Sequence, residues 1–188
     1  MTSLGQLLKW GTNDQSLRGE LDRIAEDYAG SDEHIVMQIG LVESLTSKYH
    51  HTITLVRARV PGERVFTCYQ YSLSVHNSKE VQYAMLLNAS LFFGRDFMKY
   101  LIDTRLKEIT IQDANDGDHV VYSNASIQHA GKVVAGKVES KWGRAHLWSH
   151  SVFEVPQNYG NTVQFFSRID QEVAVDAFLE YANNQVQD

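Results

Sequence analysis

The residues with the clearest potential for chemistry are one cysteine and a histidine that follows it much later in the chain. Cys68 begins an amphipathic stretch that ends at Val75, and His129 begins a strand-like run that ends at Val134. A helix start and a nearby imidazole both lower the pKa of a thiol, and the resulting thiolate is a strong nucleophile. The pair therefore predicts acyl-transfer chemistry, in which Cys68 attacks a carbonyl carbon and His129 moves the proton.

A histidine that acts as a base is usually held in orientation by a third polar group. The segment 10 to 12 residues beyond His129 supplies three candidates, Glu139, Ser140 and Lys141. In a strand, Glu139 and Lys141 share one face while Ser140 lies on the other. Parity alone does not decide which of these faces looks at the histidine.

The tetrahedral intermediate of such a reaction needs hydrogen-bond donors around its oxyanion. The backbone N–H of Cys68, at the expected helix start, is one candidate. The second donor is sought nearby, at Tyr69 or Gln70, and the sequence does not choose between them.

The eight histidines also raise the alternative of a metal site. His146 and His150 are four residues apart, which would place both on one face of a helix. Gly143 and Pro156 argue against a long helix there, and no acidic residues cluster beside the pair, so no metal and no cofactor is expected. His150 remains a candidate for orienting a loop or lining a cleft.

Composition limits the function classes further. With 188 residues the chain is long enough for one domain with a full hydrophobic core. The net charge of −6 argues against a broad surface for nucleic acid or anionic lipid. No uninterrupted apolar segment is long enough to span a membrane, so we expect no membrane association.

The compartment is predicted from the cysteine count and the N-terminus. A single cysteine excludes a disulfide framework within the chain and fits a reducing cytoplasm. Residues Met1 to Trp10 lack the basic start, the long apolar stretch and the cleavage site of a secretory signal. We therefore expect a cytoplasmic protein, while export without a cleaved signal would leave the same sequence pattern.

The elements that must position these residues can be predicted from periodicity and turn residues. Helices are expected at 17–28, capped by Asp14 or Ser16, at 35–45, and from Asp170 to the C-terminus with Val175 to Val186 on one face. Two more, separated near Gly94, are expected within 79–105. Strands are expected at 52–60, 107–111, 119–122, 129–135, 137–142 and 162–168, with a tight connection at 135–136.

This order, with helices first and an antiparallel sheet afterwards, predicts the α+β class. We expect three parts. Residues 1–60 form an N-terminal extension of helices and a strand, residues 61–170 form the catalytic core, and residues 171–188 form a helix packed on that core.

Three motifs in the core resemble the signature of NlpC-type and CHAP-type cysteine hydrolases of the papain-like superfamily. These are Gly117-Asp118 before a strand, the His129-Ala130-Gly131 strand, and a later Ser-Lys-Trp-Gly element followed by Tyr159-Gly160. The last two elements are similar to those of one branch of that superfamily. The resemblance covers roughly residues 64 to 170.

The resemblance implies a papain-like fold with Cys68 as nucleophile and His129 as general base. It makes Ser140 the preferred match to the third polar position, with Glu139 and Lys141 as competitors. NlpC-type enzymes often carry His, Asn or Gln at that position, whereas this chain carries none of these there.

The expected function is a cysteine-dependent hydrolase that cleaves an amide, peptide or isopeptide bond in a peptide or protein substrate. Peptidoglycan peptides are one substrate class that the resemblance implies, and an antibacterial effector would reconcile it with the N-terminus. The alternatives are a protein deamidase using the same pair of residues and an inactive papain-like binding or inhibitory module. Residues 1–60 are a candidate surface for a protein partner.

Overall fold

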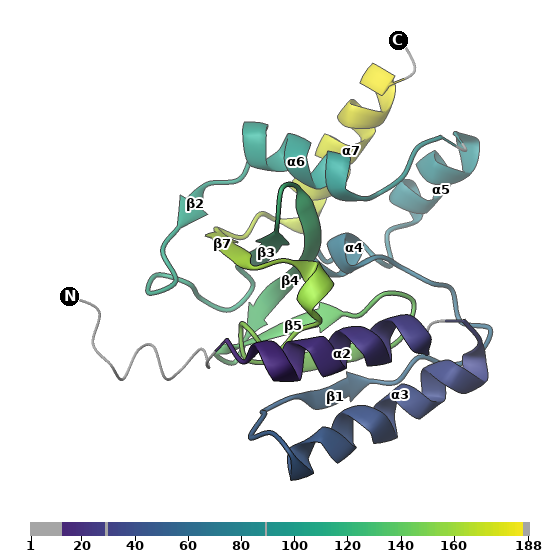
Figure 1. The fold of residues 1–188 in the computed structure, drawn as a ribbon. Coiled ribbons are helices and arrows are strands. Elements are labelled where there is room, and N and C mark those ends of the chain that lie inside the picture. Colours follow the sequence, from purple (N-terminus) through teal and green to yellow (C-terminus); the bar gives the residue numbers. More distant parts are fainter. Residues whose placement is uncertain (1–12, 29, 89, 186–188) are drawn as a thin grey trace.

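The computed structural model describes residues 13–28, 30–88 and 90–185. The predictions for residues 1–10 and for Val186 lie outside the described residues. The described part is built around one antiparallel sheet with helices on both faces (Figure 1). The α+β class predicted from the sequence is therefore confirmed.

The sheet has seven strands in the order β1-β6-β5-β4-β3-β7-β2, and every neighbouring pair is antiparallel. The strands are β1 (Thr54–Arg57), β2 (Glu108–Ile109), β3 (His119–Ser123), β4 (Ile127–Val134), β5 (Lys137–Lys141), β6 (Leu147–His150) and β7 (Thr162–Phe166). Strands β4 and β5 are joined by a two-residue turn in which Ala135 and Gly136 both have positive φ, the backbone that a tight hairpin of matching twist requires.

The described helices are α2 (Gln15–Asp27), α3 (Asp32–Ser44), α4 (Cys68–Ser72), α5 (Lys79–Leu87), α6 (Arg95–Thr104) and α7 (Gln171–Gln185), with short 3₁₀ turns η1 (Leu45–Ser47) and η2 (Gln157–Tyr159). Asp14 caps α2, as predicted, because its carboxylate accepts the free N–H groups of Ser16 and Leu17. The two helices expected within 79–105 are α5 and α6, and Gly94 is the N-cap of α6.

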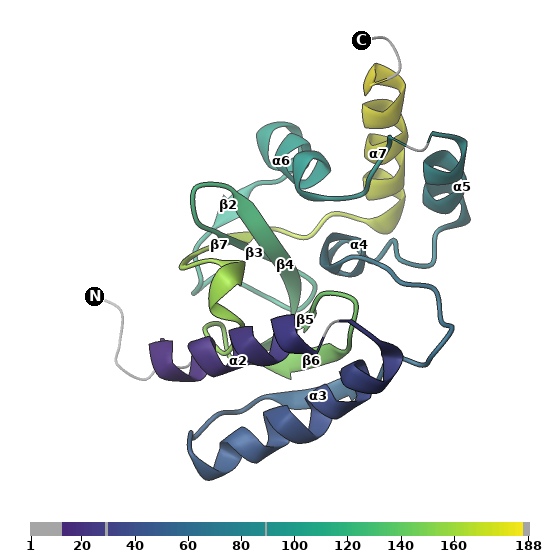
Figure 2. The same ribbon diagram turned by 45° about the vertical axis from the view of Figure 1, so that its right-hand side comes forward.

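Two hydrophobic cores form, one on each face of the sheet. On one face, Leu73 at the C-cap of α4, Phe97 of α6 and Phe178 of α7 pack against Val121 and Ala130. On the other face, Leu17 and Leu21 of α2 and Val42 of α3 share a core with strand residues that include Tyr122, Val133 and Trp148. Figures 1 and 2 show α2 and α3 together on one side of the sheet and α5, α6 and α7 together on the other.

The N-terminal extension and the core share this one sheet. β1, within residues 1–60, is an edge strand that pairs with β6, and Thr54 lies opposite Ser149. Helix α2 lies against η2, and Asp22 accepts the backbone N–H of Asn158 at 3.1 Å. Residues from the first third of the chain thus form part of the structure that supports β6 and η2.

Four of the predicted strands are shorter than predicted, β3 and β4 are each one residue longer, and one strand was not predicted at all. β1 covers four residues of the segment 52–60, and β2 covers two of 107–111. β6 was not predicted, although it lies between β1 and β5 in the sheet. In the described part of the chain, no helix combines the length and the apolar character that crossing a bilayer would need.

Candidate functional site

Helix α4 holds Cys68 at its first residue by a reciprocal capping arrangement. The Thr67 hydroxyl accepts the N–H of Gln70 at 3.1 Å, and the Gln70 side chain accepts the N–H of Thr67 at 2.8 Å. The Thr67 hydroxyl also donates to the carbonyl of Phe93 at 3.0 Å, which ties the helix start to the loop before α6. The predicted helix start at Cys68 is confirmed, and the capping box explains it.

Backbone N–H groups lie near the sulfur of Cys68. Those of Ala130 in β4 and of Tyr69 and Cys68 at the helix start favour the thiolate and act to lower the pKa, as does the positive charge of Lys141. The β4–β5 ladder begins one residue later, with Gly131 opposite Ser140. The thiol therefore lies beside the end of the β4–β5 ladder.

Burial nevertheless dominates the acidity of this thiol. It raises the pKa of Cys68 to about 11, because removing the sulfur from water disfavours the charged form more than the donors favour it. The prediction of a lowered thiol pKa is therefore wrong for the resting structure. Cys68 is a neutral thiol at neutral pH.

His129 is buried in β4, with 2% of its surface exposed, and it lies opposite Tyr122 of β3. Its Nε2 atom is buried and has no hydrogen-bond partner. Burial and, to a smaller extent, the neighbouring His150 lower the pKa of His129 well below its usual value. The imidazole is therefore neutral.

Helix α4 places Cys68 close to the part of β4 that carries His129. The Nε2 atom of His129 makes no hydrogen bond to Cys68. Ala130, which donates to the thiol, directly follows His129 and belongs to the core on the α4 face. Tyr122, the cross-strand neighbour of His129, belongs to the core on the α2 face. The imidazole of His129 and the thiol of Cys68 therefore lie on opposite faces of the sheet.

Ser140, predicted to orient His129, makes other bonds. Its hydroxyl lies 2.8 Å from Nε2 of His150 and accepts the indole N–H of Trp142 at 3.1 Å. His150 Nδ1 lies 2.8 Å from the carbonyl of Ser151, which makes Nδ1 the donor and Nε2 the acceptor of the Ser140 hydroxyl. The prediction that Ser140 orients His129 is wrong, because Ser140 lies opposite Gly131, two residues along the strand.

Glu139 and Lys141, the alternatives to Ser140 for the third polar position, and the predicted oxyanion donors also make defined hydrogen bonds. Glu139 accepts the hydroxyl hydrogen of Tyr71. The Lys141 ammonium donates to the carbonyl of Ala145 at 2.7 Å, and burial lowers its pKa to about 8. Gln70 uses its backbone N–H and its side-chain oxygen in the cap, so its side-chain amide nitrogen and Tyr69 stay the predicted candidates for the second oxyanion donor.

Tyr159 of η2 was not predicted as a site residue, yet it contacts His129 directly. The two rings are stacked, with centroids 3.9 Å apart and an angle of 16° between the planes. The N–H of Gly143 hydrogen-bonds to the Tyr159 hydroxyl, and the charge of a Cys68 thiolate would raise the pKa of that hydroxyl further. The Tyr-Gly step in the sequence was the available signal, and only the fold shows which ring it covers.

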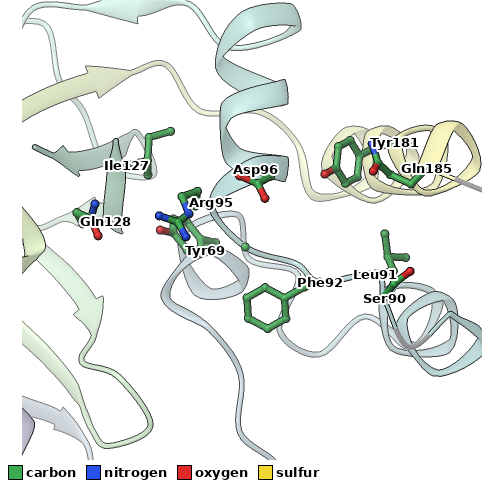
Figure 3. A pocket seen from close by; sticks show the side chains of 11 residues that line it. Tyr69, Ser90, Leu91, Phe92, Arg95, Asp96, Ile127, Gln128, Tyr181 and Gln185 are labelled. Carbon is green, nitrogen blue, oxygen red and sulfur yellow. The ribbon is translucent and has the colours of Figure 1, made fainter. Parts of the chain in front are cut away.

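A groove of about 500 Å³ is lined by Tyr69, which follows Cys68 in the chain, and by Gln128, which precedes His129 (Figure 3). Cys68 and His129 themselves are not among its lining residues. In Figure 3 Tyr69 and Arg95 lie between Gln128 and Asp96, with Tyr181 beyond Asp96. The groove offers donors, acceptors and one charge of each sign.

No group of three or more metal-ligating side chains forms within residues 13–28, 30–88 and 90–185. His146 and His150 belong to the region of β6, where His146 bonds to the N–H of Arg59 at 3.0 Å and to the carbonyl of Ile35 at 2.6 Å.

Comparisons of the chain with protein-family models, with curated proteins and with solved structures returned no match.

Proposed function

We propose that this protein is a cysteine-dependent hydrolase that cleaves an amide, peptide or isopeptide bond, with Cys68 as nucleophile and His129 as general base. The observation that carries the proposal is the position of Cys68 as the first residue of the capped helix α4, where the backbone N–H groups of Ala130, Tyr69 and Cys68 favour negative charge on its sulfur. Such preorganised donors stabilise negative charge that develops during a reaction, without the cost of reorienting solvent.

The reaction begins from a neutral thiol and a neutral imidazole. As the sulfur attacks the carbonyl carbon, its proton passes to His129, whose Nε2 has no partner that would have to be displaced. The oxyanion would be stabilised by N–H groups around the sulfur. The C–N bond then breaks, the imidazolium protonates the leaving amine, and a thioester on Cys68 remains.

Water completes the cycle. His129 takes a proton from the water molecule that attacks the thioester, the C–S bond breaks, and the thiol is protonated again as the carboxylic acid leaves. This series of reaction steps requires His129 to come within hydrogen-bond distance of Cys68 once substrate is bound. His129 lies with Tyr122 on the α2 face of the sheet and Cys68 packs on the α4 face, so this contact requires β4 or α4 to rearrange when substrate binds.

The groove lined by Tyr69 and Gln128 is suited to a peptide or protein substrate. Arg95, Asp96 and Gln128 supply a positive charge, a negative charge and an amide on its wall, which match the groups of a peptide chain. Peptidoglycan peptides and isopeptide-linked proteins both carry such groups, and an antibacterial effector is one setting in which the first class would be met.

A second candidate function is an inactive binding or inhibitory module of the same architecture. The raised pKa of Cys68 favours it, because a thiol that remains protonated at neutral pH is a weak nucleophile until it is activated. This candidate requires no role for the thiol in binding.

Hydrolysis, deamidation and binding can be separated by one experiment in H₂¹⁸O. The protein is incubated with purified muropeptides, isopeptide-linked peptides and a peptide library, and the products are analysed by mass spectrometry. Hydrolysis puts one heavy oxygen into a newly formed carboxyl group and splits the chain, while deamidation puts one heavy oxygen into an intact chain.

The proposed hydrolase yields split products with the wild type and with His34→Gln, a substitution on the exposed start of α3, but not with Cys68→Ser. Products that persist in Cys68→Ser would contradict the proposal. A labelled but intact chain would identify a deamidase, and no labelled product from any class would favour the binding module.

A further inference from the structure

The closest aromatic contact of His129 is the ring of Tyr159, at 3.9 Å between centroids and nearly parallel. The other ring beside it, that of Tyr122, is 5.7 Å away and tilted by 46°. A parallel stack at this distance opposes rotation of the imidazole out of its plane. The ring nitrogens point outward in that plane, so the stack leaves them free to exchange a proton.

The hydroxyl end of Tyr159 has interactions of its own. The N–H of Gly143 hydrogen-bonds to this hydroxyl, and a charge on Cys68 would raise its pKa. The same side chain therefore contacts the candidate base and interacts electrostatically with the candidate nucleophile.

The loop that carries Tyr159 is held by a buried cation. Arg18 of α2 has no exposed surface, and its guanidinium donates to the carbonyls of Val155 at 3.2 Å and Gly160 at 2.6 Å and to the side chain of Asn161 at 2.8 Å. Burying a charge is costly unless hydrogen bonds compensate it. Here the hydrogen bonds that compensate the buried charge also fix residues before and after Tyr159.

The backbone fixes the same loop from the other side. Gly160 has φ of +121°, and a Cβ atom there would lie 2.6 Å from backbone atoms of Ser123. The chain therefore packs directly on the end of β3, and this close approach is possible only for glycine. Tyr159 is held between the Arg18 contacts and this point of contact.

We propose that Tyr159 is the positioning residue of His129, in the role that the sequence had suggested for Ser140. This inference rests on the proposed function for its catalytic meaning, although the positioning itself is a property of the resting protein. Stacking replaces the missing hydrogen bond, since Nε2 of His129 has no partner that could orient the ring. The ring is held while the nitrogen stays available.

The titratable and charged groups that face His129 must be considered in any test that follows its ionisation. They are Tyr122 on β3, His150 on β6 and Tyr159 itself on η2, with Cys68 and Lys141 at the adjoining end of the sheet. Tyr159→Phe removes one ionisable hydroxyl and keeps the ring, while Tyr159→Leu removes both. Comparing the two separates stacking from electrostatics.

The test uses full-length protein with ¹³C-labelled histidine. Tyr159→Phe, Tyr159→Leu and the control Tyr28→Leu are compared, since Tyr28 packs edge-on against His34 at 5.8 Å in another part of the molecule. The first readout is the NMR signal of the His129 ring. The second is alkylation of Cys68 by acetyl-alanyl-alanyl chloromethyl ketone, resolved into the limiting rate and the concentration at half-saturation.

In Tyr159→Leu we expect the His129 signal to shift and broaden and the limiting rate to fall about tenfold or more, with unchanged half-saturation, because misorientation of a catalytic group acts on the chemical step. Tyr159→Phe and Tyr28→Leu should match the wild type in both readouts. An unchanged His129 signal in Tyr159→Leu would overturn the inference, as would an equal loss in Tyr159→Phe.

The two proposals fail in different ways. If wild-type Cys68 does not react with the peptide electrophile, the proposed function loses support, while the NMR readout still decides whether Tyr159 orients the ring. If Tyr159→Leu does not fold, Tyr159→Phe remains decisive through the rate. A tenfold loss in that variant would show that the hydroxyl, and not the stacked ring, is what matters.

Discussion

At the scale of single residues, the thiol of Cys68 is subject to two opposing effects. Backbone donors and Lys141 favour its ionised form, and burial opposes it more strongly, so the pKa rises to about 11. A raised thiol pKa in the resting protein is compatible with the proposed reaction. A thiol that stays protonated at rest is protected from oxidation and alkylation, and substrate binding can activate it through the base.

The raised pKa predicts how stability depends on pH. In the unfolded chain Cys68 ionises near its ordinary pKa, whereas in the folded protein it stays protonated to about pH 11. Its contribution is therefore fully present below the unfolded value and is lost as the pH rises through the folded value. The full loss amounts to about 3 kcal/mol, of which about 2 kcal/mol falls between pH 9 and pH 11, because the pKa rises from 9.0 to about 11 and one pKa unit corresponds to about 1.4 kcal/mol.

The measurement is urea unfolding of the wild type and of Cys68→Ser across the alkaline range. The difference in free energy of unfolding between the two should decrease by about 2 kcal/mol from about pH 9 to about pH 11. Tyrosines that ionise in the same range affect both proteins and cancel in the difference. Parallel pH profiles would show that the thiol is not buried as described.

Part of the candidate site follows from sequence and part does not. The Thr67–Gln70 cap is a local pattern, so the helix start at Cys68 was predictable. The hydrogen-bond partner of Ser140 depends on strand register. It is His150, which lies on β6, the strand that was not predicted. The stacking of Tyr159 on His129 depends on a loop held by a distant helix, which no local pattern encodes.

At the scale of elements, α2 serves as the support of the loop between residues 155 and 161. Its apolar residues Leu17 and Leu21 join the core, while Arg18 on the same helix reaches under the loop. The periodicity of Leu17 and Leu21 made the helix predictable. The buried position of Arg18 was not, because a charged residue beside an apolar stripe normally faces solvent.

Removing this support should weaken the loop before it weakens the sheet. In Arg18→Met the carbonyls of Val155 and Gly160 lose their donors while remaining inside the protein, which we expect to cost about 3 kcal/mol. Arg18→Lys keeps the charge without the planar fork of donors, and it should lose an intermediate amount.

Urea unfolding measures the change in stability, and hydrogen exchange of residues 155–161 measures the local effect. We expect faster exchange in that segment of Arg18→Met at unchanged exchange of β3 and β4. Unaltered protection of the loop, with a free energy of unfolding within about 0.5 kcal/mol of the wild type, would contradict the role assigned to Arg18.

At the scale of the whole molecule, one sheet with two cores joins the first third of the chain to the rest. β1 is hydrogen-bonded to β6, and β6 in turn holds His150 beside Ser140 and near His129. The core on the α4 face holds the helix start of Cys68, and the core on the α2 face holds the ring stacked on His129. The candidate site lies where these two halves meet at one end of β4.

The α+β class and most elements were predictable at this scale because helical and alternating patterns are local. β6 was not predicted, because the four residues Leu147–His150 follow a glycine turn and are too few for periodicity to identify. The strand order also lies outside local patterns, since nearly half of the chain lies between β1 and β6 in the sequence.

The central claim is that Cys68 reacts through His129, and one rate comparison tests it directly. Wild type, His129→Gln and His34→Gln are treated at neutral pH with acetyl-alanyl-alanyl chloromethyl ketone, and the adduct on Cys68 is followed by intact mass and peptide mapping. We predict a single adduct on Cys68, formed at equal rates in the wild type and His34→Gln and about a hundredfold more slowly in His129→Gln, as loss of a general base entails. Equal rates in all three proteins, or no adduct on Cys68, would contradict the account.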